Sequence, residues 1–449
     1  MKNANQFNGM KILVLGLAKS GCAASSLLHA SGAHVTVNDA SPEAGNEEAA
    51  ELRSKGIRVI CGGHPADILD AGYDIVVKNP GIPYSNSVIV EAIGKGIPVW
   101  TEIELASRIS EAPIVGITGS NGKTTTTTLL YHMLNIGNKH PLIAGNIGTV
   151  SCTVAEKATQ DNIIVLEASS FQLMGIDTFQ PKIAIWTNLY DAHLDYHGTS
   201  EAYAVAKYGI TKNQTAEDYF IYNDDQPKLR KYAARSSAVK VPFSLTGMKE
   251  NGISADDEQI YWNGKPYVLR SVIKLPGQHN LENILAATAA AILLGCDKKA
   301  IESVLSSFTG VRHRMQFVKE LQGRKFYNDS KATNTLATKS ALAAFDVPTI
   351  LIAGGLDRGQ SFEELRPYMS DVKAVVAVGE TAGKFAEFAA SCGIEIIMMA
   401  EDVQDAVRKA YPLTVAGDII LLSPACASWD QYPSFEARGD QFIEAVMEL

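Results

Sequence analysis

The chain has 449 residues, of which 46% are hydrophobic and 20% charged, which is typical of a globular protein with about three domains. Its net charge of −9 argues against a nucleic-acid-binding protein, and no uninterrupted apolar run reaches membrane-spanning length. The six cysteines lack metal-ligand spacing and the N-terminus lacks a signal-peptide core, so we expect a cytoplasmic protein without nucleic-acid or membrane partners.

Apolar runs typical of buried strands alternate with helical patterns along almost the whole chain. This alternation predicts an α/β protein with parallel sheets and crossover helices. We expect three units, at residues 1–106, 107–310 and 311–449. Between about 240 and 275, short alternating segments and the turn Asn263-Gly264 predict a small antiparallel insert.

The first unit begins with a predicted strand at 11–16, followed by the segment GLAKSG at residues 16–21. A dinucleotide-binding fingerprint would lie here, but Ala18 replaces its middle glycine, and the methyl group obstructs close approach of a pyrophosphate. Asp39 ends the next predicted strand, where such folds place a ribose-binding carboxylate. Three interpretations stay open: a tight turn without ligand, an NAD site, or a site for another diphosphate-bearing ligand.

A phosphate loop opens the second unit. The apolar run 113–117 predicts a strand, the segment Thr118–Thr125 (TGSNGKTT) a loop, and the residues after it a helix. Glycines let several N–H groups point at one anion, and the helix adds its positive N-terminal end. Lys123 would reach the β- and γ-phosphates and Thr124 would hold Mg²⁺, although Ile117 stands where the strict pattern has glycine. We expect nucleotide contacts from Gly119, Ser120, Asn121, Gly122, Lys123, Thr124 and Thr125.

Three side chains further along are candidates for phosphate chemistry. Glu167 ends the buried run 162–167, where a carboxylate can ligate Mg²⁺ beside a γ-phosphate, and we favour this over a solvated strand-end acid. His193 follows the next predicted strand and is placed at the same site, although a single histidine is more often structural. Lys207 lies on a helical stretch and by itself resembles a solvated surface lysine.

The helical pattern from Asn280 to Leu294 begins with two asparagines, Asn280 and Asn283, one turn apart. Asn280 is predicted to be the N-cap. Both amides could also face one ligand, and spacing alone does not separate capping from binding.

In the third unit, predicted strands at 349–353, 374–378, 395–399 and 418–422 each end in a small or polar loop. The segment 328–334 places an acid, a cation and two hydroxyls on one loop, and Arg358 follows a glycine pair. Ligands of open α/β sheets bind at strand carboxyl ends. These loops therefore predict a shared site for an anionic ligand.

Together these pieces resemble the Mur ligase family over essentially the whole chain. The stretch SPACAS with its FE-x-RG tail is similar to the D-glutamate-adding branch in particular. The resemblance is carried by Thr118–Thr125 (TGSNGKTT), Glu167–Leu173 (EASSFQL), Tyr203–Lys207 (YAVAK), Gln278–Asn283 (QHNLEN), His313-Arg314, Asn328–Asn334 (NDSKATN) and Leu422–Gly439 (LSPACASWDQYPSFEARG).

The resemblance implies three domains: an N-terminal Rossmann-like domain for the UDP end of the substrate, a central P-loop ATPase with a mostly parallel sheet, and a C-terminal Rossmann-like domain. The UDP substrate would meet Gly16, Ala18, Lys19, Ser20 and Asp39, with Asn146 and Ser170 near the central site. The catalytic set would be Lys123, Glu167, His193 and Lys207, and two Mg²⁺ ions would be held by Thr124, Glu167, His193 and a carbamoylated Lys207.

The remaining matches concern ATP and the amino acid. Asn280 and Asn283 match contacts on the adenine side of ATP, and ATP contacts from the third domain match Arg314, Asp329 and Lys331. Positions around D-glutamate match Thr333, Ser428 and Phe435, while Arg358 stands near where some members carry lysine. The implied monomer would join D-glutamate to UDP-N-acetylmuramoyl-L-alanine with ATP, through an acyl phosphate, in peptidoglycan precursor synthesis.

Three other functions compete with this one. A sister ligase would add another amino acid, or glutamates to a folate, and the C-terminal motif argues against it. An NAD-dependent oxidoreductase is disfavoured by the phosphate loop and by Ala18. A nucleotide switch without chemistry would turn over ATP independently of a UDP-sugar and an amino acid.

Overall fold

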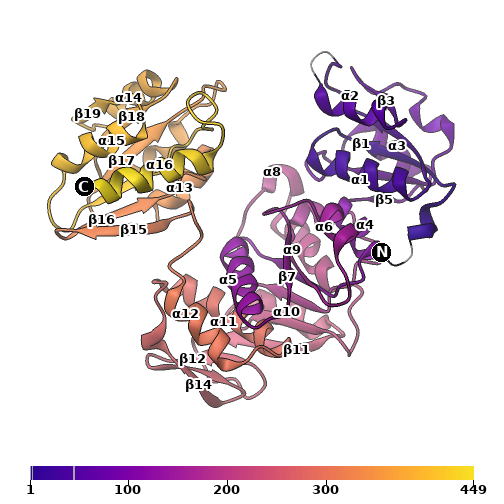
Figure 1. Ribbon diagram of the computed structural model, residues 1–449, viewed down its shortest axis with the longest axis horizontal. Coiled ribbons are helices and arrows are strands. Elements are labelled where there is room, and N and C mark those ends of the chain that lie inside the picture. The colour runs from indigo at the N-terminus through magenta and orange to yellow at the C-terminus, as the bar shows by residue number, and fades with distance from the viewer. Residues whose placement is uncertain (1, 3, 44–45) are drawn as a thin grey trace. The chain divides into compact units, whose positions relative to one another are not determined.

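The computed structural model describes residues 2, 4–43 and 46–449. The chain forms two compact units, Met1–Phe308 and Thr309–Leu449 (Figure 1). The first unit contains a five-stranded and a nine-stranded sheet, and the second contains a six-stranded sheet. The predicted α/β class with mostly parallel sheets is confirmed. In the part of the chain that the structure describes, each helix is too short or too polar to cross a lipid bilayer.

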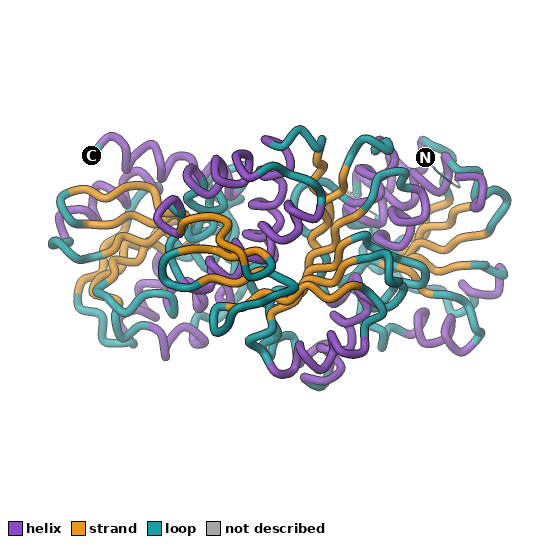
Figure 2. The backbone as a smooth tube through the Cα atoms, turned by 90° about the horizontal axis from the view of Figure 1, so that it is seen from below, coloured by secondary structure: helices purple, strands orange, loops and turns teal. Residues whose placement is uncertain are grey.

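The N-terminal sheet of the first unit is parallel, with strand order β3-β2-β1-β4-β5. Its strands are β1 (Lys11–Leu15), β2 (His34–Asn38), β3 (Arg58–Ile60), β4 (Ile75–Lys78) and β5 (Val99–Trp100). Helices lie on both sides of it (Figure 2), and this part of the chain contains η1 (Ala4–Phe7), α1 (Lys19–Ala30), α2 (Glu47–Ser54), η2 (Ile68–Ala71) and α3 (Ser87–Gly94). The strand order reverses between β1 and β4, and open α/β sheets bind ligands beside the carboxyl ends at such a point.

The central sheet of the first unit has the order β14-β13-β12-β11-β10-β9-β6-β8-β7. Its strands are β6 (Ile114–Thr118), β7 (Pro141–Gly145), β8 (Ile163–Glu167), β9 (Ile183–Trp186), β10 (Tyr219–Asn223), β11 (Val239–Ser244), β12 (Ile253–Ala255), β13 (Gln259–Trp262) and β14 (Lys265–Leu269). All pair in parallel except β13 and β14. The predicted antiparallel insert is therefore confirmed, and it extends this same sheet.

Helices that lie between these strands and after the last of them complete this part of the first unit. They are α5 (Lys123–Ile136), α6 (Ser151–Lys157), α7 (Ser170–Leu173), α8 (Leu194–His197), α9 (Ser200–Tyr208), η3 (Gly209–Thr211), α10 (Pro227–Arg235), η4 (Arg270–Val272), α11 (Gln278–Leu293) and α12 (Lys298–Ser307). The helices α5 and α11 pack together, and their apolar faces form one core with β6, β8 and β9.

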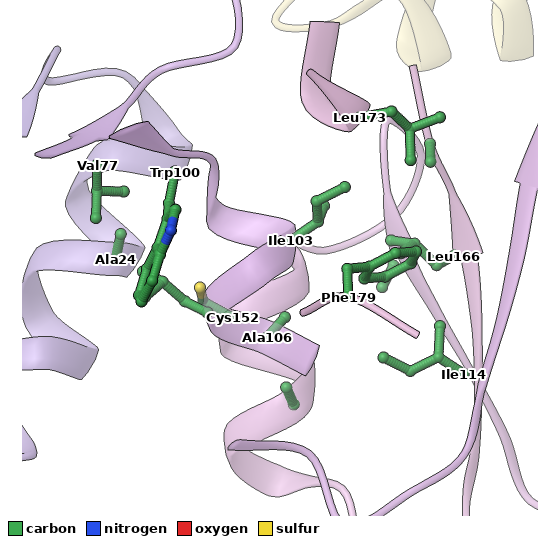
Figure 3. Packing of buried hydrophobic residues seen from close by; sticks show 14 of the residues in the cluster. Ala24, Val77, Trp100, Ile103, Ala106, Ile114, Cys152, Leu166, Leu173 and Phe179 are labelled. Atoms are coloured by element: carbon green, nitrogen blue, oxygen red, sulfur yellow. The ribbon is translucent and has the colours of Figure 1, made fainter. Parts of the chain in front are cut away.

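Helix α4 (Glu102–Ile109) joins the two sheets of the first unit. One hydrophobic cluster runs from Trp100 through Ile103 to Phe179 (Figure 3). The fully buried Glu104 carboxylate accepts hydrogen bonds from the main-chain N–H groups of residues 177–179. The predicted boundary between residues 106 and 107 lies within this helix. Because one hydrophobic cluster contains residues of both sheets and of α4, the two sheets form one compact unit.

The second unit has one sheet with the order β15-β16-β20-β17-β18-β19, in which only the edge strand β15 is antiparallel. Its strands are β15 (Gln316–Leu321), β16 (Arg324–Asn328), β17 (Thr349–Gly354), β18 (Val372–Val378), β19 (Ile396–Met399) and β20 (Ile419–Leu422). The helices are α13 (Thr335–Leu342), η5 (Glu363–Tyr368), α14 (Ala382–Ser391), α15 (Val403–Ala410), η6 (Tyr411–Leu413) and α16 (Phe435–Glu448). The four strands that the sequence predicts in this unit are confirmed.

Candidate functional site

The phosphate loop lies where three neighbouring parallel strands of the central sheet end. Ile117 of β6 pairs with Glu167 of β8, and Thr118 pairs with Trp186 of β9. The carboxyl ends of these strands therefore meet at one edge, where the chain turns from β6 into α5. Residues after the neighbouring strands support the loop, because the Asn188 side chain accepts from the Asn121 N–H at 2.8 Å.

The glycine at the start of α5 is required by a close approach. Gly122 has φ of 78°, and a methyl group there would lie 2.0 Å from the amide oxygen of Asn283. That oxygen also accepts from the Thr126 hydroxyl at 3.3 Å, so Asn283 ties α11 to the first turns of α5, directly after the loop. The Lys123 ammonium donates to the carbonyls of Gly119 at 2.9 Å and Ser120 at 3.0 Å. The loop thus places an ammonium beside the N-terminal end of a helix, as an anion site requires.

A second lysine reaches the same loop from α9. Lys207 is only 1% exposed, so the expectation of a surface lysine is wrong: its helix turns this face inward. Its ammonium donates to the Gly119 carbonyl at 2.7 Å and lies 4.6 Å from the centre of the Tyr203 ring. Burial, reinforced by the positive charge of Lys123 and opposed by Glu167, lowers the pKa of Lys207 well below its usual range. This shift favours the neutral amine, which is the nucleophilic form of a lysine side chain.

Glu167 is 4% exposed, and its Oε2 atom has no hydrogen-bond partner among the described residues. A buried carboxylate oxygen without a donor is costly unless a cation compensates it. Thr124 is buried in the first turn of α5 and supplies a second hard oxygen at this edge. These donors suit Mg²⁺, which prefers oxygen ligands. Across residues 2, 4–43 and 46–449, the structure has no cluster of three or more His, Cys, Asp or Glu side chains that could hold a metal ion. A metal site at this edge would therefore also need oxygen ligands from Thr124 and from a modified Lys207.

His193 precedes α8 and lies among aromatic rings. Its ring centre lies 5.0 Å from that of Phe171 and 6.2 Å from that of Tyr203. Because Tyr203 also lies beneath the Lys207 ammonium, the predicted histidine and lysine share one neighbour. Ser170 begins α7 in the same region, and its hydroxyl lies 2.9 Å from Nε2 of His197.

Asn146 reaches the same edge from β7, since its N–H donates to the Glu167 carbonyl at 3.1 Å and the residue is exposed. Asn280 differs from its prediction. The helix α11 begins at Gln278, two residues before the predicted N-cap, with Gly277 at the cap position. The Asn280 amide donates to the Pro276 carbonyl at 2.7 Å, so it ties the helix to the preceding loop instead of accepting from the first turn.

The N-terminal candidates gather at the switch point between β1 and β4. Gly16 follows β1, Ala18 is the N-cap of α1, and Lys19 and Ser20 lie in its first turn. The Asp39 carboxylate accepts main-chain N–H groups of Leu17 and Ser41, each at 2.7 Å. Partial burial opposes ionisation of Asp39, but these hydrogen bonds outweigh it and lower its pKa. Asp39 therefore shapes the fingerprint turn.

In the second unit, strands β16, β20 and β17 are neighbours, and Asn328 pairs with Leu422. Asp329 follows β16 and is 5% exposed, with its carboxylate accepting from the Met315 N–H at 3.1 Å and the Ser423 hydroxyl at 3.0 Å. Burial raises the pKa of Asp329 to about 7, although those hydrogen bonds and the charge of Arg314 oppose the rise. At this edge the positive charge of Arg314 therefore acts on the Asp329 carboxyl group.

The amino-acid candidates lie around the same edge of the second unit. Ser428 is buried and its hydroxyl has no partner among the described residues. Arg358 is exposed and its guanidinium stacks on the ring of Trp429 at 4.8 Å. Phe435 begins α16, and the Lys331 ammonium lies 5.9 Å from its ring centre. Thr333 is half-buried on the loop after β16, and its N–H donates to the Lys331 carbonyl.

Comparisons with known proteins match this architecture along the chain. The Mur ligase middle domain matches residues 117–291, the Mur ligase glutamate ligase domain matches 313–426, and the MurD-like N-terminal domain of Mur ligases matches 10–101. The chain belongs to the Mur ligase family. The UDP-N-acetylmuramoylalanine–D-glutamate ligases of Geobacillus sp. (strain WCH70) and Bacillus cereus (strain AH187) are each 56% identical to it over the full length of both chains.

Solved Mur ligases share the fold at low identity. The UDP-N-acetylmuramate-alanine ligase of Thermotoga maritima has a TM-score of 0.55 at 20% identity, covering 98% of this chain and 99% of its own. The MurF ligase of the same organism, solved with ADP, has a TM-score of 0.55 at 18% identity, covering 100% of this chain and 96% of its own.

Two residues that shape the site of this Mur ligase lie within the quoted motifs but were not among the predicted site residues. Tyr203 supports both Lys207 and the loop, since its hydroxyl donates to Ser120 Oγ at 3.2 Å. Arg438 is buried behind Ser330 and the Cys426 carbonyl, with one guanidinium nitrogen unpartnered among the described residues. Their place within the YAVAK and FE-x-RG segments was a signal for them, but the contacts that give each a role join segments far apart in the chain.

The buried Asp329 gives a testable dependence of stability on pH. Its folded pKa of about 7 lies above its usual 3.8, so the folded state keeps a proton that the unfolded state loses. This contribution is present below pH 4 and is lost as the pH rises towards 7, about 3 kcal/mol of it between pH 5 and pH 8. We expect the stability of Asp329→Asn relative to the native protein to rise by that amount from pH 5 to pH 8.

The measurement is urea denaturation of the second-unit transition at both pH values. Asp357→Asn is the matched control, because Asp357 is exposed in the same unit and its hydrogen bonds, from Gly359 first, lower its pKa. An equal stability difference for Asp329→Asn at both pH values would show that the carboxyl ionises normally.

Proposed function

We propose that this Mur ligase uses ATP to join D-glutamate to UDP-N-acetylmuramoyl-L-alanine. The name of relatives that are 56% identical over the whole chain supports the substrates. One observation of the structure carries the chemistry: two lysines, Lys123 and Lys207, converge on the Gly119 carbonyl. The charge of Glu167 acts on Lys207, and Oε2 of Glu167 has no hydrogen-bond partner among the described residues. Such a site can hold a nucleotide triphosphate with its cation.

The reaction must activate a carboxylate, which is a poor electrophile. An oxygen of the acceptor carboxylate attacks the γ-phosphorus, the bond from phosphorus to the ADP oxygen breaks, and an acyl phosphate results. The D-glutamate amine then attacks the carbonyl carbon, loses a proton, and expels inorganic phosphate to leave the amide. The Lys123 ammonium would offset the negative charge that phosphate and carboxylate bring together.

Mg²⁺, when bound, would neutralise phosphate charge and polarise the transferred group. Thr124, Glu167, His193 and Lys207 would hold two such ions, with Lys207 as its carbamate. The low pKa of Lys207 supports the carbamate, because only a neutral amine adds carbon dioxide. Asp39 and the turn at Gly16 would receive the UDP end, and the buried Ser428 hydroxyl would meet the amino acid.

Two assays test this function. Purified protein with ATP, Mg²⁺, UDP-N-acetylmuramoyl-L-alanine and one glutamate enantiomer should release phosphate only with the D form. Release with another amino acid from a panel would instead identify a sister ligase. In the second assay, ¹⁸O in the acceptor carboxylate should appear in the released phosphate, and phosphate without label would exclude the acyl phosphate.

A further inference from the structure

A buried lysine outside the catalytic set organises the loop at the N-terminal switch point. Lys78 is the last residue of β4 and is 1% exposed. Its ammonium donates to the main-chain carbonyls of Asn79 at 3.3 Å, Pro80 at 3.1 Å and Ile82 at 2.9 Å. Lys78 has no carboxylate partner in the part of the chain that the structure describes, and burying an ammonium among carbonyls alone is costly. Three carbonyls of one short loop converge on this charge, which indicates that the charge sets the loop's shape.

The loop that Lys78 holds forms one wall of the switch point. The Asn79 N–H donates to the Leu15 carbonyl at 2.8 Å, so the loop continues the pairing of β4 with β1. Gly16 has φ of 101°, and a methyl group there would lie 2.9 Å from Cβ of Asn79 and 3.2 Å from Cδ1 of Ile82. The loop and the fingerprint turn therefore touch, and a ligand at this edge meets both.

The same carbonyls also receive a contact from the central part of the first unit. The Tyr196 hydroxyl of α8 donates to the Ile82 carbonyl at 3.1 Å. The Tyr196 ring packs on Phe171 with centres 4.5 Å apart, and α8 begins directly after His193. A shift of this loop would therefore alter two places: the switch point between β1 and β4, where the UDP end of the substrate is expected to bind, and α8, which follows the predicted catalytic residue His193.

We propose that Lys78 is a positioning residue for the sugar-nucleotide substrate, which holds the loop 79–83 in its binding shape and couples that loop to α8. The inference rests on the proposed function, because the substrate is the UDP-linked acceptor. Lys78 itself touches the loop carbonyls and acts on the substrate through them.

Protonation of Lys78 gives a readout that a purely structural lysine would not give. Burial lowers the pKa of Lys78 to about 8, so its charge falls between pH 7 and pH 9. The titratable groups that face it are Tyr84, whose ring centre lies 4.8 Å away, and Tyr196 across the loop. Burial raises the pKa of both tyrosines, to about 12 for Tyr84, so they stay neutral in this range. A neutral amine donates more weakly than an ammonium, and the loop loosens as the pH rises.

The experiment compares Lys78→Met, Lys78→Arg and the control Lys95→Met in steady-state kinetics. Lys95 lies on the exposed end of α3, where it pairs with Asp70 and Glu91. We expect Lys78→Met to raise the KM for UDP-N-acetylmuramoyl-L-alanine on the order of tenfold, with the KM for ATP unchanged. For the native protein this KM should rise from pH 7 to pH 9, and in Lys78→Arg, which keeps its charge, it should stay level.

Two results would overturn the inference. One is an unchanged acceptor KM in Lys78→Met, and the other is an equal rise in the KM values for ATP and acceptor with a lowered unfolding temperature, which would indicate general damage. Native protein that forms no product would instead contradict the proposed function. Binding of the UDP-linked acceptor measured by calorimetry separates the two cases, since a loss of binding in Lys78→Met alone supports the inference without turnover.

Discussion

Replacement of Lys123 by alanine is expected to lower ATP-dependent ligation by about 10²- to 10³-fold or more, the range for loss of one preorganised charge at a transition state. The Lys123 ammonium lies over the loop, 2.9 Å from the Gly119 carbonyl and 3.0 Å from the Ser120 carbonyl. From this position the Lys123 ammonium can stabilise the negative charge on the γ-phosphoryl group while that group is transferred. The measurement is the rate of phosphate release that requires both acceptor and D-glutamate.

The control for this variant is Lys157→Ala, which removes an exposed lysine from the last turn of α6. Its rate should stay within twofold of the native rate. Lys123→Ala should also unfold at nearly the native temperature, so that a lower rate reports the missing ammonium and not a damaged fold. Native-like ligation by Lys123→Ala would remove the phosphate-loop assignment.

The parts of this site that are local in sequence are predictable. A strand, a glycine loop and a helix follow one another within residues 113–136, and φ of 78° at Gly122 shows why that residue must be glycine. Glu167 is predictable for a related reason, because a polar residue that ends a buried parallel strand lies at the carboxyl edge of the sheet.

Other features depend on contacts between distant segments, and local patterns do not encode them. Lys207 resembles a surface residue because nothing in the local pattern of its helix marks it as buried, yet α9 turns it towards Gly119, 88 residues earlier. Asn280 resembles an N-cap, but Gly277 allows the chain to enter the helix earlier. Lys78 lies in an ordinary apolar strand, and only the fold of the following loop shows why a charge is buried there.

Substitution of Lys207 by arginine is expected to lower ligation by about 10²-fold or more, although the positive charge is kept. Arginine stays protonated under all assay conditions and cannot add carbon dioxide. Lys207 has the opposite tendency, because burial and the nearby charge of Lys123 lower its pKa and favour the neutral amine. In the proposed carbamoylation, the amine nitrogen would bond to the carbon of carbon dioxide and release a proton, and the carbamate would serve as an oxygen ligand for Mg²⁺.

The matched control is Lys212→Arg, an exposed position five residues further along, where the exchange should leave the rate unchanged. Native protein equilibrated with ¹³C-bicarbonate should show one carbamate signal by NMR that Lys207→Arg lacks. Removal of dissolved carbon dioxide should slow the native enzyme reversibly, because the carbamate loses carbon dioxide when its supply falls. Full activity without carbon dioxide, together with an inactive Lys207→Arg, would mean that the lysine acts as a buried amine at the Gly119 carbonyl and that Glu167 holds its cation without a carbamate beside it.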